Sequence, residues 1–105
     1  MAALDIHANP EPRTRGVVPY VVELQANLLS DLNTRLVAPL APARLYQGVI
    51  PRLNPVIEIA GEPHVILTHH MAALPARLLA APPVASAEAH RHDIIAAVDF
   101  LVSGI

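Results

Sequence analysis

Asp93-Ile-Ile-Ala-Ala-Val-Asp-Phe-Leu-Val-Ser-Gly-Ile105 is the stretch that decides the fold of this 105-residue chain. Its aliphatic residues recur at the spacing of one apolar helix face: Ile94, Ile95, Val98, Leu101, Val102 and Ile105. The stretch therefore predicts a C-terminal helix. Chain ends are usually loosely held and tolerant of change, whereas this one is apolar to its last residue. We expect it either to be buried or to be presented to a partner.

The composition fits a single domain, residues 1–105, with an aliphatic core. Apolar residues make up 53% of the chain, yet it has one Phe, two Tyr and no Trp. The absence of cysteine excludes disulfides, a thiol nucleophile and thiolate metal sites. The absence of lysine excludes a Schiff-base amine and the lysine of a phosphate-binding loop.

The charge pattern favours a protein partner over nucleic acid. The formal net charge is −2, and no basic stripe of the kind that neutralises phosphates is visible. No window reaches the roughly 18 apolar residues of a membrane span. The first five residues lack the basic start and apolar run of a signal peptide. We therefore expect a cytoplasmic protein with no membrane contact and no direct sequence-specific contact to nucleic acid.

The distribution of prolines divides the chain into a strand-and-loop region and the helix. All eleven prolines lie in the first 83 residues, and proline is disfavoured inside both ladders and helices. Apolar, β-branched stretches predict the strands Leu4–His7, Pro19–Leu24, Leu36–Leu40, Val56–Ile59, His64–Thr68 and Leu74–Leu79. The pattern predicts a strongly bent antiparallel sheet followed by one helix.

The connections carry their own signals. We expect Asn9–Gly16 to be an exposed loop, Pro42–Pro55 a long connection, and Gly61 the positive-φ residue of a hairpin turn. Ser86 is the candidate N-cap of the helix, with Glu88 in its first turn.

Metal and serine chemistry are disfavoured by residue spacing. His69 and His70 are adjacent, so on a strand they would point to opposite faces. His90 and His92 would lie about 200° apart around a helix. The serines, Ser30, Ser86 and Ser103, are not in a glycine-flanked elbow. We expect no catalytic residue, no metal and no cofactor.

Several motifs together resemble the CcdB toxin family, from about Leu4 to Ile105. They are Val37-Ala-Pro-Leu40, Ala43-Arg-Leu45, Arg52-Leu-Asn-Pro-Val-Ile-Glu-Ile-Ala-Gly-Glu62, Thr68, Met71-Ala-Ala-Leu-Pro75 and Gly104-Ile105. The resemblance implies an α+β, mainly β fold of the CcdB/Kid type: a bent antiparallel five-stranded SH3-like sheet or barrel with one C-terminal helix. It also implies a non-enzymatic toxin of a toxin–antitoxin module, associated with plasmid maintenance.

The same resemblance implies partners. A homodimer would bind the A subunit of DNA gyrase and block religation of cleaved DNA, and a CcdA-like antitoxin would neutralise it. Matching positions place gyrase contacts at the helix end and beside it: Asp99, Val102, Ser103, Gly104, Ile105, Leu28 and Leu29. Candidate antitoxin contacts lie in two loops: Glu11, Arg13 and Arg15, and Tyr46, Gln47 and Val49. Well-known members carry Trp where this chain has Ser103.

Two alternatives remain open. Toxins that cleave messenger RNA share this fold, and Glu11 or Glu23 could act as base with an arginine from loops or strand ends: Arg13, Arg15, Arg52 or Arg77. The other alternative is a non-toxic CcdB homologue that keeps the fold and dimer, since Ser103 has no ring to stack on a target arginine.

Overall fold

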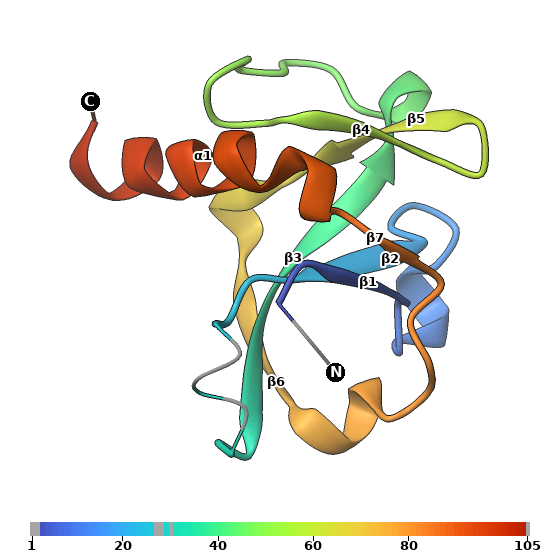
Figure 1. Cartoon of the computed structure of the whole chain (residues 1–105). Coiled ribbons are helices and arrows are strands. Elements are labelled where there is room, and N and C mark those ends of the chain that lie inside the picture. The colour runs from blue at the N-terminus through green and yellow to red at the C-terminus, as the bar shows by residue number, and fades with distance from the viewer. Residues whose placement is uncertain (1–2, 27–28, 30, 105) are drawn as a thin grey trace.

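The computed structural model describes residues 3–26, 29 and 31–104, and they form an antiparallel, barrel-like sheet with one α-helix (Figure 1). The sheet order is β4 (Val56–Ile59), β5 (Glu62–Ile66), β3 (Thr34–Pro42), β2 (Tyr20–Glu23), β1 (Asp5–Ala8) and β7 (Ala85–Ser86), with β6 (Ala72–Pro75) also paired to β3. The helix α1 spans Arg91–Ser103. The predicted α+β class is confirmed, although the described residues form seven strands and not five.

The long strand β3 bends the sheet, because different parts of it pair with different neighbours. Residues 34–37 pair with β6, residues 37–40 with β2, and residues 40–42 with β5. The predicted strand Leu36–Leu40 is therefore too short. The strand begins at Thr34 and ends at Pro42. Pro39 lies inside it, since a proline carbonyl can still accept: Leu67 N–H donates to the Pro39 carbonyl at 2.8 Å.

The predicted hairpin between β4 and β5 is confirmed, but its turn is tighter than expected. Ala60 and Gly61 both have positive φ, at 53° and 79°, which is the pattern of a two-residue type I′ turn. The prediction of a second strand at His64–Thr68 is therefore wrong at both ends. The strand begins at Glu62 and ends at Ile66, and Thr68–His70 form a 3₁₀ turn, η4.

Two predictions around the last strands are wrong. Leu74–Leu79 is not one strand: β6 ends at Pro75, and Ala76–Leu79 form a 3₁₀ turn that buries Leu79 against the sheet. Ser86 is not the cap of α1, which begins only at Arg91 after a further 3₁₀ turn, Glu88–His90. The Ser86 Oγ instead accepts the Glu88 N–H at 3.1 Å. The loop at residues 9–16 is confirmed, with a short 3₁₀ turn at Pro12–Thr14; residues 11–16 are exposed as predicted, whereas Asn9 is buried.

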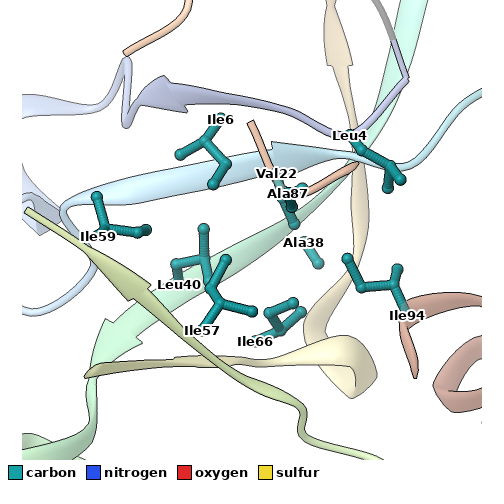
Figure 2. Close-up of a cluster of buried hydrophobic side chains, with 10 residues drawn as sticks. All are labelled: Leu4, Ile6, Val22, Ala38, Leu40, Ile57, Ile59, Ile66, Ala87 and Ile94. Atoms are coloured by element: carbon teal, nitrogen blue, oxygen red, sulfur yellow. The ribbon is translucent and has the colours of Figure 1, made fainter. Parts of the chain in front are cut away.

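The main core is aliphatic, as the composition predicts, and lies between the bent sheet and the start of α1 (Figure 2). Its buried members are Leu4, Ile6, Val22, Ala38, Leu40, Ile57, Ile59, Ile66, Ala87 and Ile94. A smaller cluster on the other face joins Val21 and Val37 to Leu79. Within the described residues, α1 is too short to cross a membrane.

Candidate functional site

The apolar stripe of α1 divides into a buried half and an exposed half. Ile94 is 3% exposed and Ala97 is fully buried. Ile95, by contrast, is 50% exposed, Leu101 39% and Val102 78%. The sequence predicted that this apolar end is either buried or presented to a partner; Ile94 is buried, whereas Ile95, Leu101 and Val102 are exposed. The end of the helix, red in Figure 1, projects beyond the sheet, and the side chains of Leu101 and Val102 there are exposed.

The last turn of α1 is closed by its own hydrogen bonds. Gly104 adopts the left-handed conformation at φ 75°, and its N–H donates to the Phe100 carbonyl at 2.8 Å. Ser103 Oγ donates to the Asp99 carbonyl at 2.7 Å. Asp99, Val102, Ser103 and Gly104 are all exposed. Four of the predicted gyrase contacts thus lie on one exposed helix end.

All seven predicted gyrase contacts remain predictions, and three of them lie apart from this exposed helix end or outside the described residues. Leu29 lies in the connection between β2 and β3 and is 47% exposed. Its position beside the helix end remains a prediction. Leu28 and Ile105 lie outside the described residues.

A shallow apolar groove runs beside α1. It has a volume of about 230 Å³ and lies between the helix and the ends of β1, β2 and β3. Its apolar walls include Leu24, Leu36, Ile95 and Val98, and Asp99 lies at its edge. Leu36, which is 37% exposed, extends the apolar surface from the helix onto β3.

The first candidate antitoxin loop is organised around Asn9, which is 7% exposed. Asn9 Oδ1 accepts the Glu11 N–H at 3.0 Å, and Arg15 Nε donates to the Asn9 carbonyl at 2.6 Å. Arg13 Nε lies 3.2 Å from Glu11 Oε1 in an exposed ion pair. The structure therefore brings Glu11, Arg13 and Arg15 together on one small surface.

The second candidate loop lies elsewhere, on the side of α1 (Figure 1). Gln47 and Val49 are exposed, whereas Tyr46 is half-buried. A hollow of about 480 Å³ separates this loop from α1 and is lined by Val49 and Arg52 on one side and Asp93 on the other. The Arg52 guanidinium lies 4.5 Å from the centre of the Phe100 ring. The two candidate antitoxin loops thus form separate surfaces.

A buried ion-pair cluster lies beside Val21 and Val37, with which His7 and Glu23 are paired in the sheet. Arg35 Nε is 3.1 Å from Glu23 Oε1, and His7 Nε2 is 3.6 Å from Glu23 Oε2. These three side chains are 3–6% exposed. Burial raises the pKa of Glu23, while Arg35 and then His7 oppose that rise. The sequence gave one signal for this cluster, the acidic Glu23 inside the predicted strand Pro19–Leu24; Arg35 lies just before the predicted strand Leu36–Leu40.

This cluster bears on the metal and ribonuclease hypotheses. Donor atoms of Asp5, His7 and Glu23 lie within 4.8 Å of one another, but the Arg35 guanidinium already places a positive charge on Glu23. A ribonuclease base must also reach its substrate, and Glu23 is 3% exposed. The other candidate base, Glu11, is exposed. It pairs with Arg13, one of the four arginines named for the ribonuclease hypothesis.

The histidine prediction needs a correction. His69 and His70 do not point to opposite faces of a strand, because they lie in the 3₁₀ turn η4. Their ring centroids are 4.2 Å apart.

The family model of the CcdB protein matches residues 3–104, nearly the whole chain. The chain belongs to the CcdB family. A search of curated proteins finds no match. Membership supports a toxin of a toxin–antitoxin pair. The family is one of gyrase poisons and not of enzymes. In this CcdB-family protein, the end of α1 that the resemblance implies as the gyrase contact is exposed.

Proposed function

We propose that this single-domain, CcdB-family protein is a homodimeric toxin that binds the A subunit of DNA gyrase and traps the cleaved gyrase–DNA complex, and that a CcdA-like antitoxin neutralises it. The observation that carries the proposal is the exposure of the helix end. Val102 is 78% exposed on a stripe whose first members are core. A side chain of this kind contributes little to folding, so its apolar character is available to a partner.

The apolar surface beside the helix supports a dimer. Ile95, Leu101 and Leu36 are each more than one third exposed, and the apolar groove lies between the helix and β3. Burying such a surface against a second copy would remove it from water. A two-fold symmetric interface would also double the helix ends offered to a symmetric target.

The chemistry of the helix end fits an arginine on the target. The C-terminus of a helix carries partial negative charge, which attracts a cation by about 0.3–1 kcal/mol. Asp99 adds an exposed carboxylate one turn earlier. Ser103 has no ring, and its hydroxyl is already bonded to the Asp99 carbonyl. The proposed contact is therefore electrostatic, without the stacking that contributes roughly 0.5–2 kcal/mol in a cation–π pair.

Ser103 also favours one second candidate, a non-toxic homologue that retains the fold and the dimer. A messenger-RNA endonuclease is the weaker alternative, because one of its two candidate bases, Glu23, is buried and paired with Arg35, which leaves only Glu11.

A truncation tests the proposal. We expect removal of Gly104 and Ile105 to leave the far-UV circular dichroism unchanged, because Gly104 is exposed beyond the helix. Binding to the immobilised A subunit of gyrase should be lost. Unchanged binding, or unfolding of the truncated protein, would show that the helix end is not the contact surface.

A further inference from the structure

Strands β1 and β2 bring three metal-ligating side chains together on one face of the sheet. Asp5 and His7 project from the same face of β1, because they are two residues apart on a strand. The register, which pairs Ile6 with Val22, places Glu23 directly opposite Asp5. One donor atom from each of the three side chains lies within 4.8 Å of the other two. His7 and Glu23 are each 3% exposed, whereas Asp5 is half-buried.

Two of these donor atoms, His7 Nε2 and Glu23 Oε2, have no hydrogen-bond partner within the described part of the chain. They lie 3.6 Å apart, which is longer than the roughly 2.7–3.2 Å of an N–H···O hydrogen bond. A proton on His7 Nε2 would not shorten this separation. Buried polar atoms are nearly always paired, because an unpaired one is unfavourable.

The separation of these two atoms fits a metal ion. Ligands that bind Zn²⁺ at about 2.0–2.1 Å in tetrahedral geometry lie roughly 3.3–3.4 Å from each other. One ion placed between His7 Nε2 and Glu23 Oε2 would therefore pair both atoms after a small movement. Because Asp5 is only half-buried, its carboxylate also gives the cluster a side that an ion can reach.

Arg35 occupies one oxygen of Glu23 and leaves the other one to face His7. Arg35 Nε lies 3.1 Å from Glu23 Oε1, and Arg35 Nη1 donates to the carbonyls of Leu32 and Thr34 at 2.6 and 2.9 Å. These contacts fix the guanidinium on the side of Oε1, away from Oε2. Carboxylates that bind metals are usually held by a further hydrogen-bonding group, which orients them. Arg35 is placed to orient Glu23 in this way.

We propose that Asp5, His7 and Glu23 bind one divalent transition-metal ion, which links β1 to β2. An imidazole nitrogen with two carboxylate oxygens suits Zn²⁺, Mn²⁺ or Fe²⁺. The ion is structural: it holds the first strand to the sheet and takes no part in the proposed gyrase contact. The sequence-based expectation of no metal considered the spacing of other histidines, whereas His7 meets Glu23 only through the register of β1 and β2.

Zinc binding to the full-length protein after EDTA treatment tests the site. Isothermal titration should give one tightly bound Zn²⁺ per chain in the wild type. Disturbing even an outer partner of a metal site costs about 10- to 100-fold in affinity, so His7→Gln and Asp5→Asn should each lose at least about 10-fold. Asp5→Asn conserves shape at a half-buried position, and it keeps the test valid if His7→Gln does not fold.

The matched control is His92→Gln, because His92 is an exposed histidine on α1. This variant should keep the wild-type affinity. Absence of stoichiometric binding in the wild type, wild-type affinity in Asp5→Asn, or loss of binding in His92→Gln would overturn the proposal.

Histidine-ring NMR tests the same site without any substitution. One equivalent of Zn²⁺ should shift the Nε2 resonance of His7 and leave the rings of the exposed His70 and His92 unchanged. Shifts confined to His70 and His92 would show adventitious surface binding and would refute the assignment.

Thermal unfolding measures the structural role. At a free Zn²⁺ concentration 100-fold above the dissociation constant, Tm should rise by roughly 10–20 °C, and EDTA should reverse the rise. A Tm that does not respond to Zn²⁺ would contradict a site that links two strands. None of these measurements involves gyrase or antitoxin, so the site and the proposed function can fail separately.

Discussion

Replacing Val102 by Arg should separate target binding from folding. Full burial of a valine side chain contributes about 1.5–3 kcal/mol. Since Val102 is 78% exposed, only about a fifth of that contribution, roughly 0.3–0.7 kcal/mol, is available within the monomer. Arginine offsets this loss, because it has a better helix propensity and a cation near a helix C-terminus gains about 0.3–1 kcal/mol. The free energy of unfolding should therefore change by less than about 0.5 kcal/mol.

The binding effect of the same substitution should be large. If Val102 is buried in the complex with gyrase, its loss costs about 1.5–3 kcal/mol, or roughly 10- to 150-fold in affinity. A positive charge would also repel a target arginine. The opposite pattern is expected for Ile94→Ala, because Ile94 is 3% exposed and such core truncations cost about 2–5 kcal/mol.

Urea unfolding and biosensor binding to the A subunit of gyrase measure the two effects. Unfolding is recorded at several protein concentrations, because dimerisation couples stability to concentration. The reasoning is refuted if Val102→Arg lowers the free energy of unfolding by more than about 2 kcal/mol, or if it binds gyrase as tightly as the wild type does.

Three further substitutions test other parts of the molecule. In the β4–β5 turn, Gly61→Ala should lower the free energy of unfolding by about 1–2 kcal/mol, because the φ of Gly61 is 79°. Ala60→Asn should raise the free energy of unfolding. Equal effects of the two substitutions in urea unfolding would contradict the turn type. Arg35→Met should destabilise the protein by about 3–5 kcal/mol at pH 7. Burial raises the pKa of Glu23 above 4.5, so the destabilisation by Arg35→Met should become smaller as the pH falls and the Glu23 carboxyl is protonated. Adding Glu23→Gln should restore stability at pH 7. An unchanged destabilisation at low pH would contradict the proposed charge pairing. Ser103→Trp should strengthen gyrase binding by roughly 2- to 30-fold per stacked pair, and an unchanged affinity would indicate a different target contact.

Local signals predicted most of the fold. The alternation at Val56–Ile59 and the Gly61 turn gave the hairpin, since both depend on neighbouring residues. Proline gave less reliable boundaries. The predicted connection begins at Pro42, whereas β3 extends to Pro42 and pairs there with His64, a partner distant in sequence. Leu79 was predicted to lie in a strand, but it belongs to the 3₁₀ turn Ala76–Leu79, which folds back and buries it against Val21 and Val37.

The site was predictable only in part, because burial is a property of the whole fold. Helical spacing placed Ile94 and Val102 on one stripe, but it could not show that the sheet covers Ile94 and ends before Val102. The pairing of Glu23 with Arg35 depends on the register of β2 and β3.

The measurement that tests the central claim most directly is plasmid cleavage by gyrase in the presence of the purified protein and ATP. Detergent and protease are added at the end of the reaction to release trapped breaks. The account predicts that linear DNA accumulates with the wild type and not with the protein lacking Gly104 and Ile105. Intact plasmid with a folded, dimeric wild type would contradict it and would favour the non-toxic homologue.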